Sequence, residues 1–306
     1  MLRYVIRRLI ALVPILIGAS LLIFVMMQLV PGDPARMTLG AEATGAQVAA
    51  LRQDWGLDRP LPIQYGLWVK RAIHGDFGRS TVSRVPASHE IATRFPATLQ
   101  LTAVSMIISV VLGLFFGIVA AVKHNMVFDH GTMVVALLGV CTPSFWLGLM
   151  LILLFSVKLG WLPSFGKGGI RHLVLPALTL GISSSVIIAR VTRSSMLEVL
   201  SDDFVRTARA KGIGERVVIV HHALKNALIP IITILGLEFG GLLAGAVVTE
   251  TVFAYPGLGL LLINSINNRD FPIVQGALLL FALEFVLVNL VVDVIYARVD
   301  PRIAYS

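Results

Sequence analysis

The chain has 306 residues, of which 57% are hydrophobic and only 14% are charged, whereas soluble globular domains carry about 25% charged residues. This composition excludes disordered, collagen-like, coiled-coil and disulfide-rich proteins and indicates a membrane protein. The net charge of +8 does not imply a nucleic-acid partner, because basic residues in a membrane protein mark cytoplasmic loops.

Six apolar segments approach or exceed the length that crosses a bilayer, about 20 residues at a rise of about 1.5 Å each. The first has 22 uncharged residues, longer than the apolar core of about 7–15 residues in a signal peptide, so we predict a retained span. The fold class is predicted as an all-α membrane protein with six transmembrane helices. The predicted spans are Leu9–Val30, Leu99–Val122, Thr132–Val157, Leu173–Ala189, Ala227–Thr249 and Phe271–Val292.

The distribution of Lys and Arg predicts that both termini are cytoplasmic. With the N-terminus inside, the cytoplasmic segments hold 13 of these residues and the short external loops hold four, as expected for cytoplasmic loops rich in basic residues. The long external segment is either a surface for a partner or a lid on its own helices. The chain then divides into a cytoplasmic N-terminus with the first helix (1–30), a periplasmic loop region (31–98) and a five-helix core (99–306) with a cytoplasmic loop at 190–226.

Small residues recur at four-residue intervals in two spans, which predicts close helix packing rather than a substrate path. They are Ser105, Ser109, Gly113, Gly117 and Ala121 in the second span, and the pairs Gly236/Gly240 and Gly241/Gly245 in the fifth. In the third span, Pro143 removes a backbone donor. A simple kink is the preferred interpretation, and a broken helix that lines the transport path is the alternative.

Two carboxylates, Glu238 and Glu284, fall near the middle of the fifth and sixth spans. An unpaired charge there costs at least about 2.5–3.5 kcal/mol, so neither side chain is expected to face lipid. One of them either faces the substrate route, where it attracts the amino group of a peptide, or is a protonated or hydrogen-bonded packing residue. The packing interpretation is preferred.

The cytoplasmic loop contains a short predicted helix between about Asp202 and Lys211. Acidic residues open this segment, basic residues close it, and Gly212 follows, which is the order favoured by the helix dipole and by helix caps. Small residues give the helix a slim profile, while Phe204 and Val205 are candidate apolar anchors for a groove in a partner. A solvated amphipathic helix is the alternative.

This segment resembles the cytoplasmic coupling loop of ABC importer permeases, in the form found in the dipeptide, oligopeptide, nickel and glutathione branch. The matching residues are Asp203, Phe204, Val205, Arg206, Thr207, Ala208, Arg209, Ala210, Lys211 and Gly212, followed by 222–230. Arg206-Thr207-Ala208 departs from the Glu-Ala-Ala of the general pattern, as is usual in this branch. Further matches lie at 31–34, 56–61, 75–78, 193–197, 253–259 and 269–275, so the resemblance covers nearly the whole chain.

The resemblance implies a type I ABC importer permease fold in the bacterial inner membrane. It implies partnership with a second homologous permease, two ATP-binding subunits and a periplasmic or lipid-anchored substrate-binding protein. The short helix would dock in the ATPase through Arg206, Arg209 and Lys211, with Gly212 ending the helix. ATP and Mg would be bound by the ATPase subunits, so this chain would need no cofactor or metal and would not be an enzyme.

Other functions have weaker sequence support. The only Gly-Lys pair, Gly166-Lys167, is followed by glycine and does not form a phosphate-binding loop. His221-His222 has no acids or cysteines nearby to complete a metal site. A proton-coupled secondary transporter using Glu238 and Glu284 is the alternative class.

Among ABC substrates, dipeptides, longer peptides, glutathione and nickel chelates stay open, although the short loop from Lys158 to His172 is more typical of the glutathione and small-peptide members.

Overall fold

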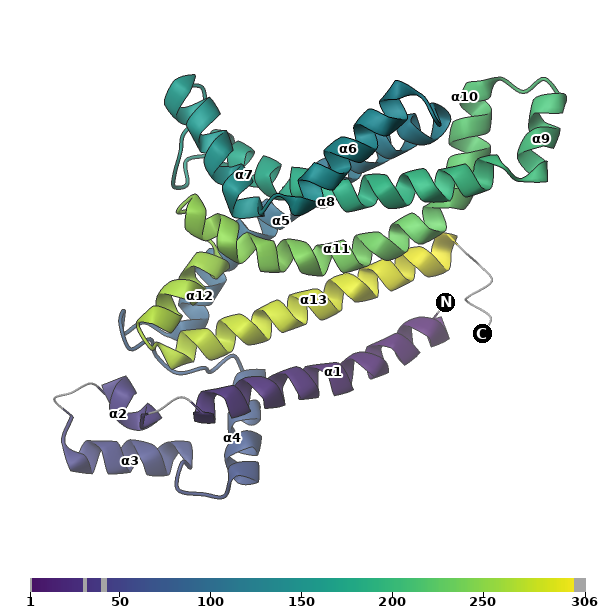
Figure 1. The fold of residues 1–306 in the computed structure, drawn as a ribbon. Helices are drawn as coiled ribbons and strands as arrows, with labels where there is room; N and C mark the ends of the chain where they lie inside the picture. The colour runs from purple at the N-terminus through teal and green to yellow at the C-terminus, as the bar shows by residue number, and fades with distance from the viewer. Residues whose placement is uncertain (1, 30–31, 40–42, 300–306) are drawn as a thin grey trace. The chain divides into compact units, whose positions relative to one another are not determined.

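In a computed structural model, residues 2–29, 32–39 and 43–299 are described, and over these ranges the chain is helical with no strand (Figure 1). This confirms the all-α prediction. The elements are α1 (Leu2–Leu29), α2 (Pro34–Leu39), α3 (Gly45–Trp55), α4 (Leu61–Ile73), α5 (Ala87–Val122), α6 (Val127–Cys141), α7 (Ser144–Leu151), η1 (Ile152–Lys158), α8 (Ile170–Leu200), α9 (Asp203–Ala210), α10 (Glu215–Val217), η2 (Val218–Ala223), α11 (Leu224–Val252), α12 (Leu258–Asn267) and α13 (Phe271–Val299).

Within the described ranges, five helical stretches are long and apolar enough to cross a membrane, and α6 with α7 and η1 supplies a sixth if that bent pair is one span. The fourth predicted span, the shortest, lies inside the 31-residue helix α8. The second ends at Val122 as predicted, but α5 begins at Ala87 and not at Leu99. Polar residues before Leu99 continue the helix because helical geometry does not require apolar side chains outside the bilayer.

The third span is broken, which corrects the preferred prediction of a simple kink. The helices on either side of Pro143 are bent by 104°, and Figure 1 shows α6 and α7 diverging from this point. Thr142 is extended, with φ −87° and ψ 118°, because a residue before proline is disfavoured in the α region. Pro143 then precedes the first turn of α7, where its missing N–H costs no hydrogen bond.

The helices divide into two compact units. The first unit comprises Leu99–Tyr255 with 2–5 and 288–299, and in it α8 packs along α11 and against α6 and α7. The small residues of α5 face α8: a Cβ added at Gly117 would lie 2.5 Å from Thr192 Cβ and 2.7 Å from the carbonyl oxygen of Ala189. The predicted packing seam is therefore confirmed at this helix pair.

In the fifth predicted span only part of the small-residue pattern serves close contacts. A Cβ at Gly236 would lie 3.0 Å from Val292, and one at Gly245 would lie 2.9 Å from Leu180. Gly241 has no neighbouring atom within 4 Å of such a Cβ. The close helix contact predicted for the Gly241/Gly245 pair is thus made by Gly245 alone.

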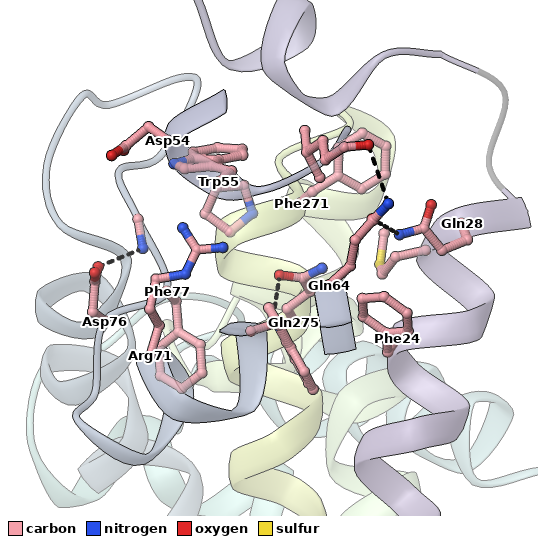
Figure 2. Close-up of a pocket in the computed structure, with 15 residues that line it drawn as sticks. Phe24, Gln28, Asp54, Trp55, Gln64, Arg71, Asp76, Phe77, Phe271 and Gln275 are labelled. Atoms are coloured by element: carbon pink, nitrogen blue, oxygen red, sulfur yellow. Dashed lines mark hydrogen bonds between the residues drawn. The ribbon is translucent and has the colours of Figure 1, made fainter. Parts of the chain in front are cut away.

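The second unit comprises Ile6–Thr98 and Pro256–Leu287. Its apolar core joins the start of α5 to α12 and α13 through Ile91, Leu258 and Val274. A second cluster joins α1 to α4, where the rings of Phe24 and Trp68 lie 5.9 Å apart. A hydrogen bond also joins α1 to α4: the Gln28 amide donates to Gln64 Oε1 at 3.3 Å (Figure 2).

Candidate functional site

The predicted cytoplasmic helix is present as α9, Asp203–Ala210. It ends where Gly212 adopts a left-handed conformation with φ +77°. The Gly212 N–H donates to the carbonyl of Arg209 at 2.9 Å, and the Ile213 N–H donates to that of Ala208 at 3.3 Å. Glycine carries no Cβ penalty in this conformation, so Gly212 fixes the point at which the helix stops.

One face of α9 is buried against the segment that follows it. Val205, Ala208 and Val218 form a small apolar cluster, with Leu200 and Ile213 packed on it. Val205 is fully buried and Ala208 is 6% exposed. Of the two predicted apolar anchors, only Phe204, at 41% exposure, is accessible to a partner. Val205 instead holds α9 on its own loop.

The opposite face of α9 is polar and basic. The residues exposed on and just after this helix are Asp203, Phe204, Arg206, Thr207, Arg209, Ala210, Lys211 and Gly212. Arg209 donates from Nη2 to Glu215 Oε1 at 2.6 Å and from Nε to Oε2 at 3.2 Å. This paired hydrogen bonding to Glu215 raises the pKa of Arg209 above its ordinary value. Arg206 makes a 3.3 Å contact with the exposed carboxylate of Asp203.

The candidate path residues are spread over different parts of the structure. Glu238, in the first unit, is half-buried on α11 and interacts with the side chain of Ser184 on α8. Glu284, in the second unit, is 6% exposed on α13. Pro143 is exposed at the break between α6 and α7. The structure therefore does not bring these three residues together in one unit.

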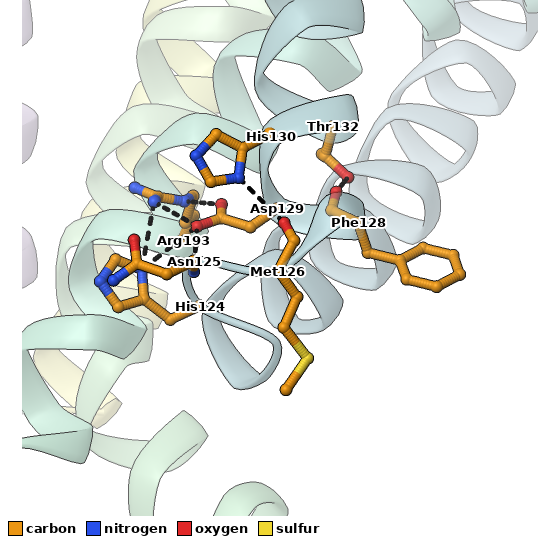
Figure 3. A network of polar contacts seen from close by, with 8 residues as sticks. All are labelled: His124, Asn125, Met126, Phe128, Asp129, His130, Thr132 and Arg193. Atoms are coloured by element: carbon orange, nitrogen blue, oxygen red, sulfur yellow. Dashed lines mark hydrogen bonds and ion pairs between the residues drawn. The ribbon is translucent and has the colours of Figure 1, made fainter.

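Sequence reasoning missed a polar cluster at the start of α6 (Figure 3). The Asp129 side chain is 3% exposed and is held by Arg193 of α8, Nε to Oδ1 at 2.5 Å and Nη2 to Oδ2 at 2.8 Å. His124 Nδ1 lies 3.2 Å from Oδ2 of the same carboxylate, and the Asn125 N–H donates to Oδ2 at 3.0 Å. The local sequence signal was a basic loop followed by an acidic residue in the first turn of α6. The partner Arg193 lies 64 positions away in the sequence, so local pattern could not predict the pairing.

Comparison with known proteins identifies the family of this helical arrangement. Residues 113–305 match the family described as "binding-protein-dependent transport system inner membrane component". Residues 1–102 match the N-terminal family of the corresponding membrane components. The chain belongs to the ABC importer permease family. It is accordingly a multi-pass inner-membrane permease subunit that works with a partner ATPase and a substrate-binding protein.

Two relatives match this permease from end to end. The glutathione transport system permease protein GsiC of Salmonella choleraesuis (strain SC-B67) is 50% identical over 306 residues, covering 100% of both chains. The protein of the same name from Escherichia coli (strain K12) is 49% identical with the same coverage.

Solved transporters share the fold at lower identity. An inward-facing structure of the MetNI methionine ABC transporter matches with a TM-score of 0.58 and 20% identity, over 69% of this chain and 96% of that chain. An amino acid ABC transporter with histidines matches with a TM-score of 0.52 and 18% identity, over 69% and 94%. These matches confirm the type I ABC importer permease fold.

Proposed function

We propose that this permease forms the membrane pathway of an importer for glutathione and peptides of similar size. The proposal is supported by 49–50% identity to two glutathione permeases over the whole chain. It is also supported by the short loop from Lys158 to His172, which is more typical of small-peptide members. Neither a nickel chelate nor proton-coupled transport is favoured by these relatives.

In the proposed assembly, the permease pairs with a second homologous permease and with two ATP-binding subunits, which bind ATP and Mg²⁺ and catalyse the hydrolysis. A periplasmic or lipid-anchored binding protein delivers the substrate. Both termini are cytoplasmic in this arrangement, as the excess of Lys and Arg in the cytoplasmic segments supports. Loop 190–226 and α9 then lie on the ATPase side, and loop region 31–98 lies on the side of the binding protein.

The geometry of α9 is the observation that carries the coupling role. Its buried face is held by Val205 and Ala208, and its end is fixed by the turn at Gly212. The exposed face therefore presents Phe204, Arg206 and Lys211 on a helix that is fixed to α8 on one side and to η2 on the other. Closure of the ATPase subunits moves α9 as a rigid body. This movement tilts α8 and, through η2, the long helix α11, which changes access to the pathway.

Reconstitution tests the proposed function directly. The permease, its partner permease, the ATPase subunits and the binding protein are placed in proteoliposomes, and uptake of radiolabelled glutathione is measured with and without ATP. ATP-dependent uptake is expected, with competition by short peptides and none by a nickel–histidine chelate. Uptake by the permease alone, or ATP-dependent import of the nickel chelate without import of glutathione, would contradict the proposal.

A further inference from the structure

A cavity of about 370 Å³ lies within the second unit, between α1, α3, α4 and the start of α13. Figure 2 shows the aromatic rings of Phe24, Trp55, Phe77 and Phe271 around it. Sites for small molecules have volumes of about 300–1,000 Å³ and combine apolar walls with a few polar groups. The size of this cavity therefore suits a ligand of a few residues and excludes a folded partner.

The amide groups in the cavity are held in place by the surrounding structure. The Trp68 indole N–H donates to Gln275 Oε1 at 3.0 Å, so the NH₂ group of Gln275 is a donor for a ligand. Gln64 is 9% exposed, and its NH₂ group donates to the carbonyl oxygens of Leu57 at 3.1 Å and Arg59 at 2.7 Å. Both N–H groups of Gln64 are thereby used within the protein and its Oε1 accepts from Gln28, so of these two amides Gln275 is the one with a donor for a peptide carbonyl.

Arg71 places a guanidinium at the wall of the cavity. Its guanidinium lies over the Trp55 ring, 5.6 Å from the ring centroid, and points into the cavity in Figure 2. Across the described parts of the chain, no carboxylate lies within ion-pair distance of Arg71. A half-buried charge without a partner is costly, and a guanidinium binds a carboxylate through two parallel hydrogen bonds. Arg71 is thus suited to an incoming carboxylate.

Acidic groups at the edge of the cavity supply the opposite charge. Asp54 and Asp76 are both exposed and line the cavity. Asp76 Oδ1 accepts the Gly78 N–H at 3.0 Å, which fixes the orientation of this carboxylate. The cavity therefore offers an arginine, carboxylates, amide groups and aromatic walls to one ligand, and a molecule with both an ammonium and a carboxylate group complements this set.

We propose that this cavity is a binding site for a zwitterionic short peptide on the permease itself. Arg71 pairs with a carboxylate of the peptide, Asp54 or Asp76 receives its ammonium group, and Gln275 donates to a peptide carbonyl. The inference rests on the proposed function and deepens it. In the proposed orientation the cavity opens on the external side, where it holds substrate between release from the binding protein and entry into the pathway.

Binding to the assembled importer, without the binding protein and in lipid nanodiscs, tests this site. Glutathione is titrated by calorimetry and by the fluorescence of the tryptophans. Arg71→Gln is expected to weaken binding about tenfold or more, because it removes a hydrogen bond to a charged group. Arg71→Lys keeps the charge and is expected to bind with intermediate affinity. Arg52→Gln is the matched control, since Arg52 pairs with Asp33 at 3.3 Å and does not line the cavity.

Glutathione diethyl ester, which has no carboxylate, provides the second arm of the test. It is expected to bind the wild-type importer more weakly than glutathione does and to bind Arg71→Gln no more weakly than it binds wild type. Equal glutathione affinity in wild type and Arg71→Gln, or absence of binding to wild type, would overturn the inference. Uptake with the binding protein is measured separately, so importers that transport glutathione without this binding would leave the proposed function intact.

Discussion

Arg193 on α8 holds Asp129 on α6 through two hydrogen bonds, 2.5 Å and 2.8 Å long, while the Asp129 side chain is only 3% exposed. This fork joins the start of the broken third span to the helix that leads into α9. Two parallel bonds between a guanidinium and a carboxylate fix orientation as well as distance. The fork therefore fixes the distance and the orientation between α8 and the start of α6 (Figure 3).

Loss of one partner in this fork is expected to destabilise the permease strongly. Arg193→Gln leaves the buried Asp129 carboxylate without its cation, a change that costs about 3–5 kcal/mol for buried pairs. Thermal unfolding in detergent should show a clear fall in melting temperature. Arg193→Lys keeps the charge but loses the fork, so it should be intermediate. Equal melting temperatures for Arg193→Gln and wild type would contradict a structural role for the pair.

Charge reversal on α9 should separate docking from folding. The Arg206 side chain is 76% exposed and pairs with the exposed carboxylate of Asp203, and surface pairs contribute about 0–1 kcal/mol. Arg206→Glu should therefore fold normally but lose most of the substrate-stimulated ATPase activity of the assembled importer. The basal ATPase activity of the isolated ATPase subunits is the control, because they do not contain the substitution.

Arg209 requires a paired design because its guanidinium is bound to Glu215. Arg209→Glu alone places two carboxylates together, which disturbs the loop as well as any docking. The double exchange Arg209→Glu with Glu215→Arg restores the internal pair. If Arg209 docks to the ATPase, the double exchange should recover thermal stability but not coupled ATPase activity. Full recovery of both would assign Arg209 to the loop alone.

An added methyl group should clash at Gly117, in the seam between α5 and α8, but not at Gly131 on α6. Gly117→Ala would place its Cβ 2.5 Å from Thr192 and 2.7 Å from the Ala189 carbonyl oxygen, and overpacking of this kind costs about 1–3 kcal/mol. Gly131→Ala on α6 meets no atom within 4 Å and should stabilise its helix slightly. Melting temperatures of the two variants are expected to move in opposite directions, and a shift in the same direction would contradict the packing assignment.

The sequence was sufficient to predict features that depend on local pattern. Span length follows from hydropathy, and α9 follows from the order of acids, bases and Gly212 along one short segment. Features that depend on tertiary contacts could not be predicted from the sequence. The 104° break at Pro143 depends on the packing of α6 and α7 on α8, and proline alone does not fix an angle. Likewise, the Arg71 cavity is assembled from helices that are distant in sequence.

The two intramembrane carboxylates, Glu238 and Glu284, are the candidate charged groups of the substrate path. Glu238 is half-buried beside Ser184, whereas Glu284 is 6% exposed. If either carboxylate attracts the ammonium group of the substrate, its Gln variant should slow ATP-dependent glutathione uptake at unchanged melting temperature, because Gln keeps the shape and removes the charge. If both are packing residues, Glu238→Gln and Glu284→Gln should transport at the wild-type rate. N-acetylated glutathione, which lacks the ammonium group, decides between the two cases: a path carboxylate should discriminate against it in the wild type but not in the corresponding Gln variant.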